Sequence, residues 1–348
     1  MTPVFRVGIT PDFYVEAKGH FEAALEQKLA NQPGIEYVPM PPQPGNIATP
    51  EALNQFDAIF ALATKFTAES LRGVDRLALV ARWGVGYDMI DVPALTAAGV
   101  ALAITPNAVK RPVAEAILTL IFALSKNLPT LDGTVRDGKW RGDLPRLGVG
   151  VVGKVLGSIG CGNIAQQLFR LAASLGFARF IAYDPYVTAA PGVELITLEE
   201  VLRQSDYITV NTLLNDSTRG MIGEPQFRMM KPTAYFINTA RGPIVDQRAL
   251  TQALQQKIIA GAGIDVFEKE PPDPRDPLLA LDNVIVSPHA MAWTEEIARD
   301  NTLEACDNIL SVSRGEPPAG LVNREVLTHP KWKHRTATCR STVRERPL

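Results

Sequence analysis

Three short segments in the second half of the chain carry side chains that could act together on a carbonyl group. Arg241 lies in the segment NTARG, Glu270 in DVFEKEPP, and His289 at the end of SPH. An arginine can hold a carboxylate and polarise a carbonyl, a histidine can move a proton near neutral pH, and a neighbouring glutamate can keep that histidine protonated. Each segment directly follows an apolar run, so the three groups together could reduce a 2-oxo acid.

The elements that must position these groups follow the rhythm of an α/β protein, in which short β-rich runs alternate with longer helical patterns. In the first third we expect strands at Phe5–Ile9, Ala58–Ala61, Leu77–Ala81 and Val100–Ile104, and helices near Glu16–Ala30, Ala68–Leu71 and Val92–Ala98. A second series predicts strands near Val155–Ile159, Phe180–Tyr183, Tyr207–Val210, Ala234–Ile237, Gly261–Ile264 and Val284–Val286. Six strands are the number expected of a complete dinucleotide-binding sheet.

Two further helices and a tail complete the prediction. An apolar helix from Pro112 to Leu124, opened by the proline in its first turn, should lie between two layers or two domains. Another helix is expected near Glu295–Val312. From Lys331 onward the chain carries six Lys/Arg and one Glu. This basic end could touch a phosphate-rich ligand, but we expect a solvated, poorly ordered tail.

Composition excludes several classes of function. The 348 residues are 46% hydrophobic, enough for roughly two domains of ordinary size. A net charge of −2 and a pI of about 6.1 give no case for binding nucleic acid or an anionic membrane, so small molecules or other protein chains should be the partners. No apolar run is long enough to span a bilayer.

Cysteine usage and the N-terminus bear on the compartment. The cysteines, Cys161, Cys306 and Cys339, are odd in number and form no CxxC pair, so we predict neither disulfides nor a metal site. The first residues lack a basic segment followed by an apolar run. We therefore expect a reduced, cytoplasmic protein.

A glycine-rich turn predicts a dinucleotide site. After the strand that ends at Ile159 the chain reads G-x-G-x-x-A, in which Gly160 would allow a tight turn, Gly162 would let the backbone approach a pyrophosphate, and Ala165 would let helix and strand pack closely. The next strand ends at Asp184, roughly 20 residues on, where a carboxylate would accept hydrogen bonds from the ribose hydroxyls. A glycine turn beside a surface aspartate is the alternative interpretation.

Asp184 also bears on which cofactor is bound. Its charge would repel the 2′-phosphate of NADP, and the following Pro185 and Tyr186 supply no arginine to neutralise that phosphate. The sequence therefore favours NAD (NAD+/NADH) over NADP.

Together these segments resemble the D-isomer-specific 2-hydroxyacid dehydrogenases. The glycine turn with its aspartate, Met230-Lys231-Pro232 with the NTARG segment, the Asp265–Pro271 segment and the SPH segment carry the resemblance, and Arg82–Asp91 resembles that family's substrate loop. The match covers roughly residues 5–325.

The resemblance implies two Rossmann-like or flavodoxin-like α/β domains with parallel sheets. The NAD-binding domain, residues 105–291, would be inserted into a discontinuous substrate domain, residues 1–104 and 292–325, leaving 326–348 as the tail. It further implies an active site in the cleft and a homodimer joined through the cofactor domains.

The resemblance also implies roles for the catalytic and substrate-binding residues. Arg241 would bind the substrate carboxylate and polarise the C2 carbonyl, and His289 would exchange a proton with that oxygen. Glu270 would pair with His289 and stabilise its imidazolium. The backbone amides of Val85 and Gly86 would hold the carboxylate. Singly, the arginine could cap a turn, the glutamate could be a solvated loop residue and the histidine could be structural.

The cofactor contacts implied by the resemblance extend beyond the glycine turn. Asp265 would meet the nicotinamide carboxamide. The other expected contacts are Gly160, Gly162, Asn163, Ile164, Asp184, Thr218, Thr239 and Arg241. Of the remaining histidines, His20 is expected on the first helix, and His329 and His334 in the tail, so His289 is the one placed for catalysis.

Departures from the family pattern bear on the substrate. Where phosphoglycerate-using members carry an Arg-Ser-Arg-Thr loop, this chain has Ala61–Lys65, which lacks guanidinium partners for a phosphate. After His289 the usual small residues are replaced by Ala290–Trp293, which favours a small or moderately apolar oxo acid such as glyoxylate, hydroxypyruvate or a simple 2-ketoacid. Trp83 and Trp293 could close over substrate or be ordinary packing, and Asn107 could contact substrate or shape a turn.

Two alternatives to this function stay open at this point. Close relatives oxidise formate or phosphite with the same cofactor machinery. Other relatives are corepressors that sense NAD(H) and bind proteins.

Overall fold

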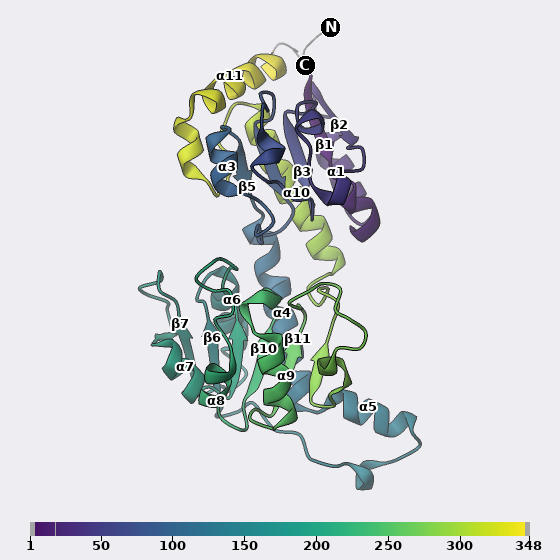
Figure 1. Cartoon of the computed structure of the whole chain (residues 1–348), viewed down its shortest axis with the longest axis vertical. Helices are drawn as coiled ribbons and strands as arrows, with labels where there is room; N and C mark the ends of the chain where they lie inside the picture. Colours follow the sequence, from purple (N-terminus) through teal and green to yellow (C-terminus); the bar gives the residue numbers. More distant parts are fainter. Residues whose placement is uncertain (1–3, 18, 345–348) are drawn as a thin grey trace. The chain divides into compact units, whose positions relative to one another are not determined.

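The computed structural model describes residues 4–17 and 19–344, which fall into two compact α/β units (Figure 1). The first unit combines Met1–Val109 with Trp293–Leu348, and the second is Lys110–Ala292. The sequence-based domain boundaries lie a few residues from these divisions. Both units contain a parallel sheet covered by helices, which is the predicted fold class.

The first unit is built on a five-stranded sheet with the order β2-β1-β3-β4-β5. Every adjacent pair is parallel, and the order is the flavodoxin-like one. Its strands are β1 (Phe5–Ile9), β2 (Ile35–Pro39), β3 (Ala58–Ala61), β4 (Leu79–Arg82) and β5 (Ala101–Ala103). Its helices are α1 (Glu22–Leu29), α2 (Pro50–Leu53), α3 (Val92–Ala97), α10 (Glu295–Ser313) and α11 (Pro330–Arg344), and α4 (Pro106–Ser125) begins in it.

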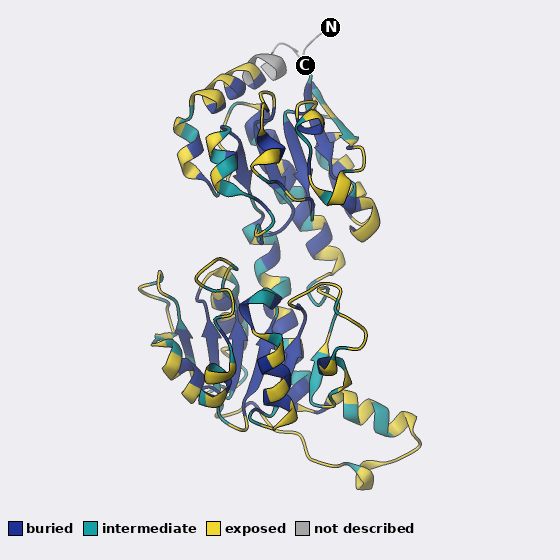
Figure 2. Ribbon diagram, in the orientation of Figure 1, coloured by how far each residue is buried: buried dark blue, intermediate teal, exposed yellow. Residues whose placement is uncertain are grey.

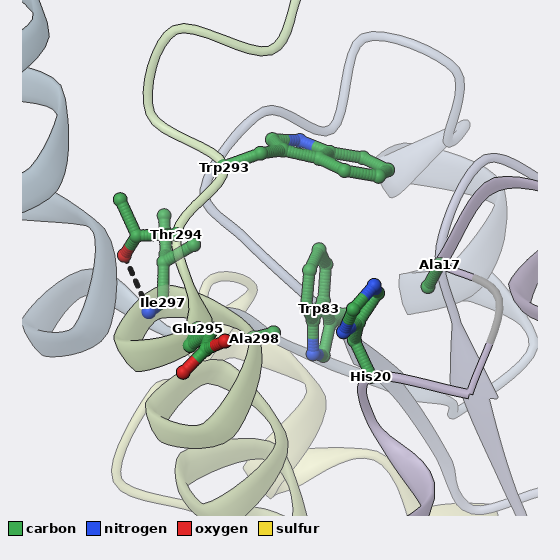
Figure 3. A pocket seen from close by; sticks show the side chains of 8 residues that line it. All are labelled: Ala17, His20, Trp83, Trp293, Thr294, Glu295, Ile297 and Ala298. Carbon is green, nitrogen blue, oxygen red and sulfur yellow. Dashed lines mark hydrogen bonds between the residues drawn. The ribbon is translucent and has the colours of Figure 1, made fainter.

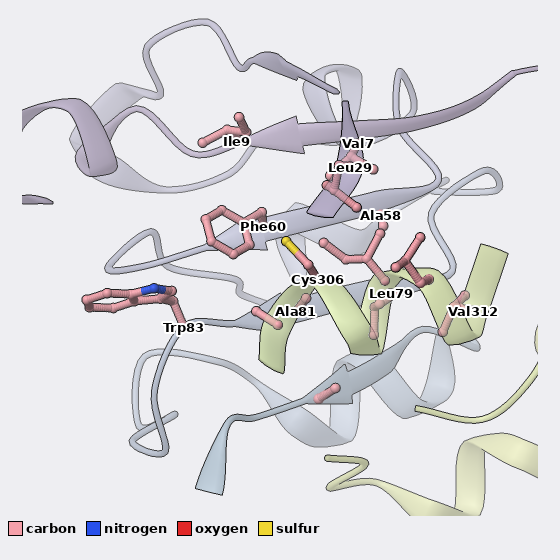
Figure 4. Close-up of a cluster of buried hydrophobic side chains, with 14 of the residues drawn as sticks. Val7, Ile9, Leu29, Ala58, Phe60, Leu79, Ala81, Trp83, Cys306 and Val312 are labelled. Atoms are coloured by element: carbon pink, nitrogen blue, oxygen red, sulfur yellow. The ribbon is translucent and has the colours of Figure 1, made fainter. Parts of the chain in front are cut away.

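One core cluster of the first unit lies between this sheet and helices α1 and α10 (Figure 4), and a second contains residues of α2 and α3. All four residues of β3 are buried, as expected of a parallel strand covered on both faces. Phe60, Leu79 and Cys306 are buried in this core. Figure 2 shows the buried strands at the centre of each unit and exposed residues on the outer faces of the helices.

Two predictions for the first part of the chain were wrong. The expected helix Glu16–Ala30 is broken at Gly19, whose φ is +85°, so a short π-helical turn at Phe13–Ala17 precedes α1. His20 therefore lies in the turn before α1 rather than on a helix. Strand β2 was missed because its residues are only half-buried, at the edge of the sheet, and give no clear alternation.

The expected poorly ordered tail was also wrong over most of its length. Pro330–Arg344 form helix α11, and Trp332 and Arg335 are buried at 4% and 6% exposure. The guanidinium of Arg335 donates to the carbonyls of Val74, Asp75, Ala98 and Gly99 at 2.7 to 3.0 Å. A buried arginine with four acceptors docks the helix, a long-range contact that composition does not reveal. Residues 345–348 lie outside the described part of the chain.

The second unit is built on a seven-stranded parallel sheet with the order β12-β11-β10-β9-β6-β7-β8. Counted from β6, this is the dinucleotide-binding order 3-2-1-4-5-6 with one extra strand. Its strands are β6 (Val155–Ile159), β7 (Arg179–Tyr183), β8 (Glu194–Leu195), β9 (Tyr207–Val210), β10 (Tyr235–Asn238), β11 (Gly261–Ile264) and β12 (Val284–Val286). The short β8 was not predicted. The helices are α5 (Leu128–Arg136), α6 (Asn163–Ala172), α7 (Leu198–Gln204), α8 (Glu224–Met229) and α9 (Gln247–Gln255), with most of α4.

Helix α4 begins six residues before the predicted start, so Pro112 lies inside it. The carboxylate of Glu304 accepts hydrogen bonds from the backbone N–H groups of Asn107 and Ala108, because the first turn of a helix offers its N–H groups no intrahelical acceptor. The Asn107 side chain donates to the same carboxylate at 2.9 Å. This contact, distant in sequence, sets the start of the helix. No helix within the described ranges could cross a membrane.

Candidate functional site

In the second unit, most of the predicted site residues follow the carboxyl ends of parallel strands. Because these ends meet at one edge of a sheet, residues far apart in sequence become neighbours. The turn after β6, the loop after β10, and the loops after β11 and β12 supply Gly160, Arg241, Glu270 and His289. The adjacent strands β6 and β9 mark the position where the strand order reverses, which is where doubly wound sheets bind ligands.

The glycine turn after β6 has the geometry that its sequence predicts. Gly160 has φ +97°, and a Cβ there would lie 2.5 Å from the carbonyl oxygen of Asn211. Gly162 precedes α6, and a Cβ there would meet nothing within 4 Å. The backbone N–H groups of Asn163 and Ile164 open the helix, and such first-turn amides are ready donors to a phosphate.

Asp184 is fixed at the end of β7 by backbone amides. Its carboxylate accepts hydrogen bonds from the N–H groups of Cys161 at 2.8 Å, Tyr186 at 2.9 Å and Val187 at 3.2 Å. A carboxylate has about four acceptor positions, so this one retains capacity for a hydroxyl donor. Burial, and then the charge of Asp184, raise the pKa of the Cys161 thiol, so this cysteine stays a neutral filler of the turn.

The loop that carries Arg241 is held by Asn238, a buried residue to which the sequence analysis gave no role. The Asn238 side chain donates to the carbonyl of Arg241 at 3.0 Å and accepts from the N–H of Ala240 at 3.0 Å. Arg241 Nη1 donates to the carbonyl of Ala240 at 2.7 Å. A polar side chain directly at the end of an apolar strand was the signal that could have identified Asn238.

Gly242 allows this loop to contact the loop after β11. A Cβ at residue 242 would lie 1.9 Å from the carbonyl carbon and oxygen of Phe267. No side chain fits there, so the two loops touch through their backbones. Phe267 is three residues before Glu270, and the contact therefore sets the spacing between the Arg241 loop and the Glu270 loop.

Glu270 and His289 form the expected pair. Glu270 Oε2 lies 2.9 Å from His289 Nδ1, and Oε1 accepts from the N–H of Phe267 at 3.0 Å. Burial opposes ionisation of Glu270, but the hydrogen bond and charge of His289, the Phe267 N–H and the charge of Arg241 together hold its pKa below the usual range. The pairing uses Nδ1 and leaves Nε2 as the ring nitrogen available to a substrate.

Asp265 orders the loop that presents His289. Its carboxylate accepts hydrogen bonds from Ser287 Oγ at 2.7 Å, the N–H of Ala290 at 3.0 Å and the N–H of Met291 at 3.2 Å. Its carbonyl accepts from the N–H of His289 at 2.8 Å. These bonds hold His289 at φ +55°, a left-handed conformation that costs a residue with a Cβ about 1 kcal/mol or more. The predicted contact of Asp265 with nicotinamide stays a prediction.

The two predicted threonines differ in how their hydroxyl groups are used. Thr218 Oγ1 donates to the carbonyl of Leu213 at 2.7 Å and accepts from the N–H of Asn215 at 2.9 Å, so it shapes its own loop. Thr239 Oγ1 is buried and has no hydrogen-bond partner among the described residues. An unpaired buried hydroxyl is costly, and a bound molecule with a donor or acceptor would satisfy it. The unpaired Thr239 hydroxyl and the open space beside Gly162 both fit a bound dinucleotide.

The predicted substrate loop lies in the first unit. Gly84 has φ +124° and makes two hydrogen bonds to Thr105. The Thr105 hydroxyl accepts from the Gly84 N–H at 2.8 Å, and the Thr105 N–H donates to the Gly84 carbonyl at 3.0 Å. Arg82 Nε donates to the carbonyl of Gly86 at 2.8 Å. The N–H groups of Val85 and Gly86 donate to no other residue that the structure describes. Each unit thus carries a separate group of the predicted site residues.

Comparisons with known proteins agree with these observations. The profile described as D-isomer specific 2-hydroxyacid dehydrogenase, NAD binding domain, matches residues 118–291. A glyoxylate reductase of Korarchaeum cryptofilum is 38% identical over 285 residues, which cover 80% of this chain and 86% of that one. A D-3-phosphoglycerate dehydrogenase of Methanocaldococcus jannaschii is 39% identical over 266 residues, 75% of this chain and 50% of that one. The crystal structure of a glyoxylate reductase from Paecilomyes thermophila superposes with a TM-score of 0.78 at 28% identity, covering 92% and 98% of the two chains.

Proposed function

The chain belongs to the D-isomer specific 2-hydroxyacid dehydrogenases, and from this premise we propose that it reduces a small 2-oxo acid to the D-2-hydroxy acid with NADH, or catalyses the reverse oxidation. The observation that carries the proposal is the 2.9 Å contact between Glu270 and His289. This pair lies at the strand edge that also carries Arg241, and the charge of Arg241 acts on Glu270. An acid–base pair beside a carboxylate-binding guanidinium matches the chemistry of an oxo acid.

His289 is proposed as the proton donor in reduction. Glu270 binds Nδ1, so Nε2 would give its proton to the C2 oxygen and take it back from the hydroxyl in oxidation. The carboxylate at Nδ1 would hold the ring in the orientation that presents Nε2 to the substrate. The hydrogen bonds that Asp265 makes to the His289 loop would keep the ring in this position.

Arg241 and the substrate loop are proposed to hold the acid itself. A guanidinium can bind two oxygens at once, so Arg241 would contact the carboxylate and polarise the C2 carbonyl. The N–H groups of Val85 and Gly86, which have no other acceptor among the described residues, would bind the remaining carboxylate lone pairs. A glycine at residue 86 lets the carboxylate approach the backbone closely.

The cofactor is proposed to bind along the strand edge of the second unit. Gly160, Gly162 and the first amides of α6 would hold the pyrophosphate, Asp184 the ribose, and Thr239 the nicotinamide end. When bound, NADH supplies the hydride that C2 accepts. Asp184 would also disfavour NADP because a carboxylate repels the 2′-phosphate.

The names of similar proteins suggest the substrate class. Several are glyoxylate reductases, and others are D-3-phosphoglycerate dehydrogenases. The loop after β3 has no arginine and its Lys65 is exposed, so we propose a non-phosphorylated acid such as glyoxylate or hydroxypyruvate.

We further propose that the protein is a homodimer in the cytoplasm. Residues 128–152 carry an unusual set of exposed apolar side chains, including Leu128, Val135, Trp140 and Leu147 at 56% to 85% exposure. Such a surface is typical of a protein interface, and a second copy would bury it. The three buried, unpaired cysteines suit a reducing compartment.

The test is a turnover assay with a matched histidine control. Purified protein with NADH should consume the cofactor in the presence of glyoxylate, hydroxypyruvate or pyruvate. His289→Ala should abolish turnover while NADH binding remains, and His334→Ala, at an exposed histidine on α11, should leave turnover unchanged. A wild type that binds NADH but reduces no oxo acid would overturn the proposal, and formate or phosphite oxidation would then show the alternative activity.

A further inference from the structure

An apolar pocket of about 170 Å³ lies within the first unit, apart from the groups already assigned (Figure 3). Its walls are mostly apolar side chains: Ala17, Trp83, Trp293, Ile297 and Ala298. Figure 3 shows Trp83 and Trp293 near the first turn of α10. The size is that of a cavity that can hold a six-membered ring, since an engineered cavity of about 150 Å³ binds benzene.

One wall of the pocket is fixed and one is open to solvent. Trp83 is 4% exposed, its Nε1 donates to Thr302 Oγ1 at 2.9 Å, and its ring packs edge-on against Phe13 at 5.9 Å. Trp293 is 42% exposed, and its ring meets that of Trp83 at 6.2 Å and 79°. A large exposed indole beside a fixed one leaves apolar surface that a ligand could cover.

Trp83, the fixed wall of the pocket, belongs to the substrate loop whose amides are proposed to bind the carboxylate. Trp83 directly precedes Gly84, and Val85 is two residues away, so their Cα atoms lie within about 7 Å. Thr105 holds Gly84 on both sides, which makes the connection rigid. A molecule whose carboxylate binds the Val85 and Gly86 amides can therefore place an apolar substituent near the pocket.

The rim of the pocket favours a neutral substituent over an acidic one. Glu295 lies at the rim on the first turn of α10, and His20 lies opposite it in the turn before α1. An exposed carboxylate repels a second carboxylate on a substrate. The walls contribute apolar contacts, and the two indoles offer aromatic faces and edges.

We propose that this pocket receives the C3 substituent of the 2-oxo acid and selects a six-membered aromatic ring, so that arylpyruvates are preferred to pyruvate and glyoxylate. The inference rests on the proposed function, the reduction of a non-phosphorylated 2-oxo acid, and places acids with an aromatic substituent ahead of small ones such as glyoxylate. One extra methylene in an apolar pocket changes the ratio of kcat/KM between two substrates by about 10-fold or more, and a six-membered ring buries several times the area of a methylene. We therefore expect kcat/KM for phenylpyruvate to exceed that for pyruvate at least tenfold.

The experiment measures kcat/KM with NADH for phenylpyruvate, 4-methyl-2-oxopentanoate, pyruvate, glyoxylate and 2-oxoglutarate. The expected order places phenylpyruvate first and 2-oxoglutarate last. In Trp293→Ala the ratio of phenylpyruvate to pyruvate should fall at least tenfold, and Trp293→Phe should restore part of it. Val15→Ala, at a 69% exposed residue near the pocket that does not line it, should leave the ratio unchanged.

The outcomes separate this inference from the proposed function. If pyruvate or glyoxylate is reduced at least as well as phenylpyruvate, or if the ratio is the same in Trp293→Ala as in the wild type, the pocket inference is wrong while the proposed function stands. If no oxo acid in the panel is reduced, the proposed function itself fails. Because Trp293 is 42% exposed, the alanine variant should fold, and its thermal unfolding midpoint checks this.

Discussion

Replacement of Gly242 by alanine should separate the two loops that carry Arg241 and Glu270. A Cβ at residue 242 would lie 1.9 Å from Phe267, whereas ordinary contact begins at 3.4 Å, so one loop must retreat by about 1.5 Å. A misplacement of about 1 Å at a catalytic group can cost about 10²-fold. We therefore expect kcat/KM for oxo acid reduction to fall at least 10²-fold.

The assay follows NADH oxidation, with NADH binding and thermal unfolding measured in parallel. NADH binding should persist at least in part because the glycine turn and Asp184, which would hold the pyrophosphate and the ribose, follow other strands. Gly223→Ala is the matched control, since a Cβ there would meet nothing closer than 3.7 Å, and it should keep near-normal kcat/KM. Gly242→Ala with wild-type kcat/KM and wild-type stability would refute the idea that this backbone contact sets the spacing of the two catalytic loops.

Three further perturbations test separate parts of the account. Asp184→Ala should relax the preference for NAD; unchanged discrimination between NADH and NADPH in steady-state kinetics would mean that another group sets it. In the folded protein the pKa of Glu270 lies below its usual value of about 4.3, which applies to the unfolded chain. The ionised carboxylate therefore stabilises the folded state fully above that value, and this stabilisation is lost as the pH falls through the lower pKa of the folded protein. The unfolding midpoint of the wild type should therefore fall more steeply than that of Glu270→Gln as the pH drops below about 4, and parallel curves would contradict this. Arg335→Met should leave four carbonyls without this donor, those of Val74 and Gly99 in buried hydrogen bonds, and destabilise the first unit by about 3 kcal/mol in a denaturant titration; a loss within ~0.5 kcal/mol would show that α11 docks by other contacts.

Local sequence signals predicted most of the strands and the proximity of Glu270 and His289. Strands such as Ala58–Ala61 and Val284–Val286 are continuous apolar runs, which are typical of parallel sheets. Because the carboxyl ends of such strands share one edge, the residues that follow them were expected together, and the Glu270 and His289 side chains do meet.

Contacts between distant segments explain what the sequence did not reveal. Helix α11 is polar in composition, and only the acceptors around Arg335 make it part of the core. The start of α4 depends on Glu304, almost 200 residues away. The need for glycine at residue 242 comes from Phe267, and the pocket beside Trp83 comes from a helix at the other end of the chain.

The configuration of the product tests the central claim most directly. Wild-type protein should be incubated with NADH and each oxo acid that it reduces to a chiral product, such as hydroxypyruvate, pyruvate or phenylpyruvate, and the hydroxy acid formed should be separated on a chiral column; glyoxylate is left out because its product, glycolate, is achiral. The account predicts the D-enantiomer alone, formed in a one-to-one ratio with the NAD+ produced. An L-enantiomer, a racemate, or NADH oxidation without a hydroxy acid would contradict it.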